Sequence, residues 1–129
     1  MTPELTVLAL AAILQVIQIG LAGMVMNADL GAKWNAGPRD SQPEFSPMTG
    51  RLRRAVSNHF EALSLFTIAV VLVSLSGQGS PLTAAAAWIY LGARILYVPA
   101  YAYGWAPWRS LIWAAGFFAT FAIILACLV

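Results

Sequence analysis

Charged side chains are scarce in this sequence: Asp, Glu, Lys and Arg make up 9% of its 129 residues, against about 25% in an ordinary soluble domain. Hydrophobic residues make up 60%. The lone cysteine, Cys127, excludes an internal disulfide, and we expect no metal site. A net charge of +2 without runs of Lys or Arg argues against a nucleic-acid partner. The composition predicts an integral membrane protein with a single domain, residues 1–129, in contact with membrane lipids.

Strongly polar residues are also scarce in four long stretches of the chain. Each has about 20 residues, enough to cross a hydrocarbon core of about 30 Å as a helix. The first is too long for a signal-peptide core, so we interpret it as a span. Backbone groups in lipid must pair within the segment, which favours helices. We therefore predict an all-α bundle of four transmembrane helices: Leu5–Met26, Ala55–Leu75, Leu82–Tyr103 and Trp108–Val129.

The connections between these stretches differ in length and charge. The first, Asn27–Gly50, is long and contains Pro38, Pro43 and Pro47, whereas "SGQGSP" and "YGWAP" are short. All seven Lys and Arg residues lie in or toward the first and third connections. The positive-inside rule predicts that these two connections are cytoplasmic and that both ends of the chain are outside.

The segment "RLRRAVSNHFEALSLF" carries polar residues into the second predicted span. Helical spacing places five of its residues on one face: Arg51, Arg54, Asn58, Glu61 and Leu65. Glu61 lies about 15 Å deep, and an unpaired carboxylate there is costly. Arg94 on the third span reaches a similar depth, so we predict a Glu61–Arg94 ion pair. Such a pair could serve packing alone.

Two further features lie toward the same side of the membrane. Arg94, Tyr97 and Tyr101 share a helix face, which is also typical of an interfacial aromatic belt. In "APWRSLIW", Pro107 precedes Arg109 and Ser110 at the start of the fourth span. Free backbone N–H groups there, with the arginine, favour an anion or a thiolate. The alternative is an arginine that reaches to the lipid headgroups.

Together these residues predict a polar pocket that opens to the cytoplasm and holds a small anionic molecule. Its apolar walls would admit a second, lipophilic substrate from the bilayer. No comparable polar residues line the outer halves of the spans, which argues against a transport path.

The motif "RRAVSNHFE", with "ARILYVPAY" and "APWRSLIW", resembles the membrane-associated proteins in eicosanoid and glutathione metabolism, the microsomal glutathione transferases and their relatives. "WNAGPRD" is similar to the bacterial branch, which implies a bacterial inner membrane. The resemblance implies a homotrimer with glutathione between protomers. The glutathione-binding residues that the resemblance implies are Arg54, Asn58, Glu61, Arg94 and Tyr101. Arg51 and Tyr97, which share the same helix faces, are predicted to belong to the same binding site. Arg109, with Ser110 beside it, would stabilise the sulfur as thiolate.

The chain departs from this pattern at three positions. Ser57 stands where a further arginine is frequent, Tyr97 replaces a frequent histidine, and Trp113 replaces a frequent tyrosine. His59 points away from Asn58 and is interpreted as a packing residue. Two functions stay open. One is a glutathione-dependent transferase or peroxidase that acts on lipophilic electrophiles or lipid hydroperoxides. The other is a non-catalytic membrane protein that binds a lipid headgroup or another small anion.

Overall fold

The computed structural model describes residues 1–40 and 45–129, and within them the chain forms five helices and no strand. They are α1 (Pro3–Leu30), α2 (Ala32–Ala36), α3 (Pro47–Ser76), α4 (Pro81–Ala102) and α5 (Trp108–Ala126). The four long helices are each long and apolar enough to cross a membrane, which confirms the predicted four-span, all-α fold. The short α2 in the first connection was not predicted, and Pro43 lies outside the described residues.

Capping residues explain where α3 and α4 begin. Ser46 accepts a hydrogen bond from the backbone N–H of Thr49, and Pro47 follows at the first helical position, where a missing N–H costs nothing. The helix therefore begins about two turns before the predicted Ala55 and includes Arg51 and Arg54. At α4, Ser80 and Thr83 form a capping box, again with a proline between them.

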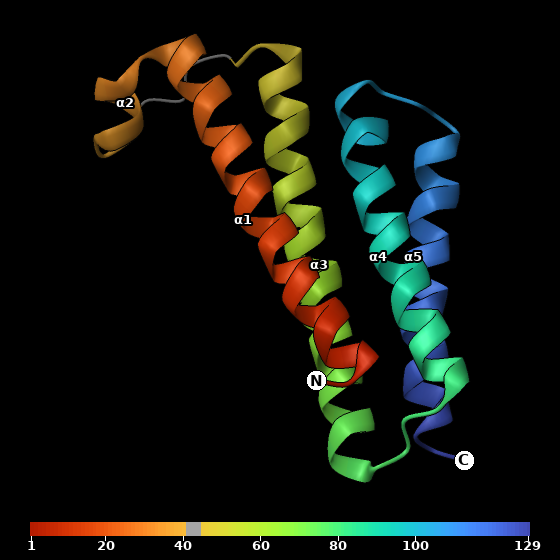
Figure 1. Cartoon of the computed structure of the whole chain (residues 1–129). Coiled ribbons are helices and arrows are strands. Elements are labelled where there is room, and N and C mark those ends of the chain that lie inside the picture. Colours follow the sequence, from red (N-terminus) through yellow and green to blue (C-terminus); the bar gives the residue numbers. More distant parts are fainter. Residues whose placement is uncertain (41–44) are drawn as a thin grey trace.

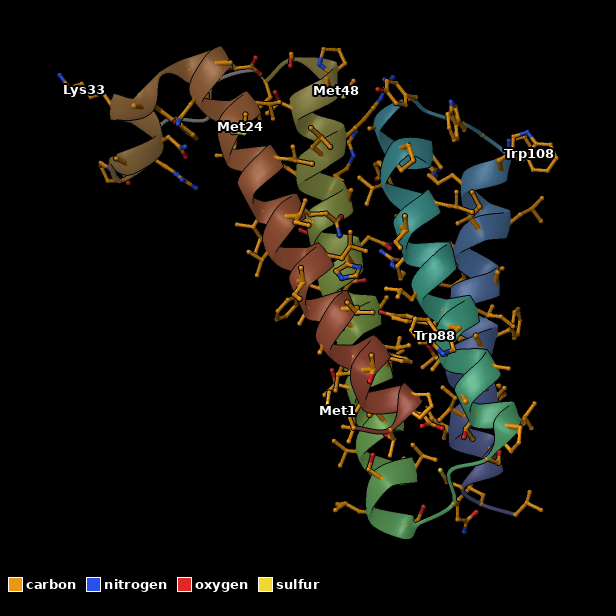
Figure 2. All side chains as sticks on the ribbon, in the orientation of Figure 1. Met1, Met24, Lys33, Met48, Trp88 and Trp108 are labelled. Atoms are coloured by element: carbon orange, nitrogen blue, oxygen red, sulfur yellow. The ribbon has the colours of Figure 1, made fainter. Side chains whose placement is uncertain are left out.

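The four long helices run antiparallel to their chain neighbours, and α1 packs mainly against α3 and α4 mainly against α5 (Figure 1). The turn between α3 and α4 begins at Gly77, whose φ of +68° is left-handed and favours glycine. This turn and both ends of the chain lie at one end of the bundle, called here the Glu4 end. The α2 segment and the α4–α5 connection lie at the other, called the Arg109 end. Lys33 and Trp108 are labelled there in Figure 2.

The buried apolar core occupies the half of the bundle toward the Glu4 end. Small residues on α4 let the other helices approach closely, and the rings of Phe66 and Tyr90 stack with centroids 4.0 Å apart. All four long helices contribute to this core: Val7, Ala11, Phe66, Ala69, Val70, Val73, Ala86, Ala87, Tyr90, Leu91, Ala119 and Ile123.

Glu4 is buried at this end, with 3% of its surface exposed. The Thr83 hydroxyl donates to its Oε1 at 2.5 Å. Thr83 lies in the first turn of α4, where the positive end of the helix dipole favours a carboxylate. Glu4 thus ties α1 to α4, a role that was not predicted from the sequence.

Candidate functional site

Three helices contribute side chains to a pocket at the Arg109 end. It has a volume of about 460 Å³, within the range typical of small-molecule sites. It brings together four predicted site residues from α4 and α5 with one from α3. Its lining is Asn58, Tyr97, Tyr101, Arg109, Ser110, Trp113 and Ala114.

Tyr101 is held between two arginines from different helices. The Arg54 Nε donates to the Tyr101 hydroxyl at 3.2 Å, and the Arg109 guanidinium lies 5.0 Å from the centre of the ring. A cation within about 6 Å of an aromatic ring is attracted to its face. Tyr97 continues the aromatic surface, with its centroid 5.5 Å from that of Tyr101. The predicted tyrosine face, together with the arginines that contact it, therefore forms a positively charged wall of the pocket.

Arg94 is buried, but its partners differ from the prediction. Its Nε donates to His59 Nδ1 at 3.2 Å, and its Nη1 donates to Asn58 Oδ1 at 3.2 Å. Its guanidinium also lies 4.4 Å from the centre of the Tyr97 ring. The two groups that accept its hydrogen bonds are thus neutral side chains of α3.

The expected Glu61–Arg94 ion pair is wrong. Glu61 is exposed, and no hydrogen bond or ion pair joins it to any residue that the structure describes. The physical reason is that the Arg94 guanidinium directs its Nε and Nη1 donors to His59 and Asn58, while Glu61 lies on an exposed part of α3. Equal depth along two helices did not establish contact, because rotation about the helix axis decides which side chains meet.

His59 connects α1 to α4 through α3. Its Nε2 lies 3.1 Å from the backbone oxygen of Ala11, while its Nδ1 receives the Arg94 Nε–H. This geometry requires a neutral ring with its hydrogen on Nε2, which donates to Ala11. The ring is fully buried, so His59 packs between helices as predicted, but it also orients Arg94.

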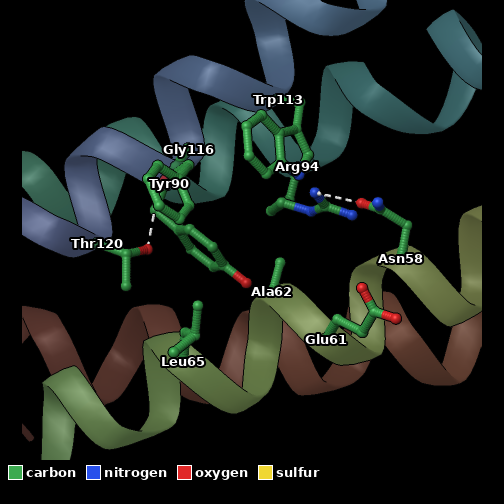
Figure 3. Close-up of a pocket in the computed structure, with 10 residues that line it drawn as sticks. Asn58, Glu61, Ala62, Leu65, Tyr90, Arg94, Trp113, Gly116 and Thr120 are labelled. Carbon is green, nitrogen blue, oxygen red and sulfur yellow. Dashed lines mark hydrogen bonds between the residues drawn. The ribbon is translucent and has the colours of Figure 1, made fainter.

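The same network fixes the amide of Asn58. Since its oxygen accepts from Arg94, its two N–H groups are left to face the pocket. Figure 3 shows Asn58 and Arg94 joined in this way, with the Glu61 carboxylate beside them. This edge of the site offers amide donors next to a negatively charged acceptor.

Arg51 lies outside this pocket, although its helix face predicted a binding role. Its Nη1 donates to the backbone oxygen of Ala102 at 3.3 Å, in the last turn of α4. A cation there satisfies a terminal carbonyl and complements the helix dipole. The contact ties α3 to the end of α4.

The start of α5 also differs from the expectation of free amides. The backbone N–H of Arg109 donates to Trp105 O at 2.7 Å, and that of Ser110 donates to Pro107 O at 3.1 Å. These donors are used by the tight α4–α5 connection. The positive character of this corner therefore comes from the Arg109 side chain.

A second, smaller cavity of about 110 Å³ adjoins the first and shares Asn58 and Trp113 with it. Figure 3 shows Tyr90, Arg94 and Gly116 around it. Tyr90 was missed in the sequence, although it precedes Arg94 by four residues and so continues the Arg94–Tyr97–Tyr101 face. That spacing was the available signal.

Ser57 lies on a different side of α3. It lines a groove of about 310 Å³ together with Arg39 and Arg53. Two cations are therefore present beside the position where an arginine was expected. Among the described residues, no group of three or more His, Cys, Asp or Glu side chains could hold a metal ion.

Comparison with known proteins gives one finding about the chain as a whole. The family model described as MAPEG family matches residues 7–129. No curated protein and no solved structure matches the chain significantly.

Proposed function

The chain belongs to the MAPEG family, and from this premise we propose that it is a glutathione-dependent membrane enzyme. The family relates the chain to glutathione metabolism in membranes in general. The finer proposal is a transferase or peroxidase that acts on lipophilic electrophiles or lipid hydroperoxides, with Arg109 stabilising the thiolate of glutathione.

The observation that carries this proposal is the composition of the 460 Å³ pocket. It combines a half-buried arginine and a serine of α5 with a tyrosine pair of α4 and the amide of Asn58. Glutathione has two carboxylates, an ammonium group, two amides and a thiol. A pocket that holds it needs donors, an acidic acceptor and a cation near the sulfur. The pocket supplies the donors and the cation, and Glu61 of the adjoining cavity supplies the acidic acceptor.

Each end of the peptide has a candidate partner. Arg54 and the free N–H groups of Asn58 would bind carboxylate and amide oxygens through charge-assisted or neutral hydrogen bonds. The unpartnered Glu61 carboxylate would accept from the ammonium group. Arg94 and Tyr97 would support the site by holding Asn58 and Tyr101 in place.

Arg109 would act on the sulfur. A nearby cation stabilises a thiolate relative to the thiol and so lowers the pKa of the bound thiol. In a transferase reaction the thiolate forms a C–S bond to the electrophilic carbon of the substrate. In a substitution the bond to the leaving group breaks and that group departs with the bonding pair, and in a conjugate addition the π pair of the C=C bond takes up a proton. In a peroxidase reaction two glutathione molecules reduce one hydroperoxide, which yields the disulfide, an alcohol and water.

We also propose a homotrimer in a bacterial inner membrane, with glutathione between protomers and the Arg109 end in the cytoplasm. In such a site, Arg39 and Arg53 would supply the positive charge that relatives with an arginine at the position of Ser57 have there. Native mass spectrometry in a mild detergent should detect trimers. Detection of monomers alone would remove the intersubunit site from the proposal.

Calorimetry of the purified protein with glutathione tests binding, and S-methylglutathione is the matched ligand without a thiol. Thiolate absorbs in the ultraviolet and thiol does not, so a pH titration of bound glutathione measures the pKa of its sulfur. We expect saturable binding and a thiol pKa below that of free glutathione. Binding without a thiolate signal would favour the alternative, a non-catalytic protein that holds a lipid headgroup or another small anion.

A further inference from the structure

The hydroxyl of Tyr90 is buried and has no hydrogen-bond partner among the described residues. The side chain as a whole is 1% exposed. A buried polar group without a partner is destabilising, so the position calls for an explanation beyond packing. Packing in the core explains the burial of the ring, but it does not explain why a hydroxyl is present there.

The ring of Tyr90 has little freedom to turn its hydroxyl elsewhere. It stacks on Phe66 with an angle of 6° between the ring planes. Figure 3 shows the hydroxyl pointing toward α3 near Ala62. The nearby Thr120 hydroxyl donates to the Gly116 carbonyl at 3.0 Å instead. The Tyr90 O–H is therefore a fixed donor directed into the 110 Å³ cavity.

The rest of this cavity is mainly apolar on the side away from Arg94. Ala62, Leu65 and Phe117 line it, and both Leu65 and Phe117 are also exposed on the outer surface of the four helices. The cavity thus reaches from the exposed apolar surface of the four helices to the Asn58–Trp113 border with the larger pocket. Its volume holds only the head of a lipophilic molecule, so the tail must extend over the exposed side chains.

We propose that this cavity binds the second substrate and that the Tyr90 hydroxyl donates a hydrogen bond to an oxygen of that molecule. The ligand class is an apolar chain that carries a hydrogen-bond-accepting oxygen, such as a carbonyl or a hydroperoxide, near its reactive end. The inference rests on the proposed function in one respect, namely that the second substrate is lipophilic. It adds where this molecule binds and which chemical group the protein recognises.

The test compares two probes of equal chain length, 2-undecanone and undecane, each labelled with ¹³C. Each is titrated by NMR into the full chain in lipid nanodiscs without glutathione. In the parent protein the ketone should bind saturably, with the carbonyl resonance shifted in the direction of hydrogen bonding. Tyr90→Phe should weaken ketone binding about five- to tenfold and leave undecane binding unchanged.

Thermal unfolding separates this role from a structural one. Since the hydroxyl has no partner in the chain, Tyr90→Phe should unfold at the same temperature as the parent or higher. A hydroxyl that supports the fold would give a lower unfolding temperature. Unchanged ketone affinity in Tyr90→Phe, an equal loss for both probes, or no saturable ketone binding in the parent would each overturn the proposal.

Gly116 provides a second pair of variants that does not alter Tyr90. A Cβ atom added there would meet Ala93, Tyr90 and Arg94 at 3.5–3.9 Å, which is ordinary van der Waals contact. Gly116→Ala should therefore keep ketone binding, whereas Gly116→Leu should abolish it by filling the cavity. Equal binding in these two variants would contradict the location. Because no glutathione is present, failure here leaves the glutathione titration as a separate test of the proposed function.

Discussion

At the Glu4 end of the bundle, the buried side chains of Glu4 and Thr83 bond to each other, whereas toward the Arg109 end the Glu61 carboxylate and the N–H groups of Asn58 bond to nothing in the described chain. Glu4 is closed off by Thr83, which in turn belongs to the capping box of α4. At the Arg109 end, Glu61 and the inward N–H groups of Asn58 are left open beside a cationic wall. A satisfied group stabilises the fold, and an open one is available to a ligand. The difference separates a structural polar cluster from a candidate binding site within one small bundle.

The largest effect on activity is expected at Arg109, which we propose to lie beside the sulfur of glutathione. Arg109→Leu should lower the conjugation rate at neutral pH about a hundredfold and reduce glutathione affinity only modestly, because carboxylates and amides are bound elsewhere. The pKa of the bound thiol should rise, as measured by ultraviolet titration. Lys33→Leu, a change of an exposed cation at the same end, is the control and should have no effect. An unchanged thiol pKa in Arg109→Leu would falsify the role given to this residue.

At the Glu4 end we expect a substitution to change the stability of the fold and not the binding of glutathione. Thr83→Val keeps the side-chain shape but leaves the buried Glu4 carboxylate without its donor. It should lower the free energy of unfolding by about 1.5–3 kcal/mol, measured by thermal unfolding in detergent, and leave glutathione affinity unchanged. Thr67→Val is the matched control, since the Thr67 hydroxyl bonds only to Leu63 in its own helix. A loss of glutathione binding in Thr83→Val would mean that the two ends are not independent.

His59 has a structural role through the Ala11 carbonyl and a role in the site through Arg94. Two substitutions separate these roles. Asn at this position retains an acceptor near Nδ1 for Arg94, whereas Gln retains a donor near Nε2 for the Ala11 carbonyl. We expect His59→Asn to keep glutathione affinity but lose about 1 kcal/mol of stability. We expect His59→Gln to weaken affinity about fivefold, because Arg94 no longer holds Asn58. Calorimetry and thermal unfolding measure the two effects, and equal behaviour of both variants would show that His59 only fills space.

The smallest effect on stability is expected for Glu61→Gln. An exposed carboxylate without a partner contributes little to folding, so the free energy of unfolding should change by less than about 0.5 kcal/mol. Glutathione affinity should nevertheless fall, since the ammonium group loses its counter-charge. A double-mutant cycle with Arg94→Met should give a coupling free energy near zero. A coupling above about 1 kcal/mol would restore the ion pair that the structure does not contain.

Much of the site could be predicted from sequence because helical spacing needs no tertiary information. The shared face of Arg94, Tyr97 and Tyr101 and the position of Arg109 after Pro107 both follow from a period of 3.6 residues and a proline at a helix start. Helical spacing could not predict the roles of Arg51, His59 and Tyr90. Each depends on which neighbour lies opposite: the Ala102 carbonyl, the Ala11 carbonyl together with Arg94, or an apolar cavity.

The sequence by itself determined that the chain spans a membrane four times as helices, because hydrocarbon tolerates few charges and no unpaired backbone. It also determined that the basic residues gather at one end, since that depends only on their order along the chain. Only the tertiary structure decided that Arg94 bonds to His59 and Asn58 instead of Glu61. Side-chain partners depend on how each helix is rotated about its axis, and that rotation is set by the packing of all four helices at once.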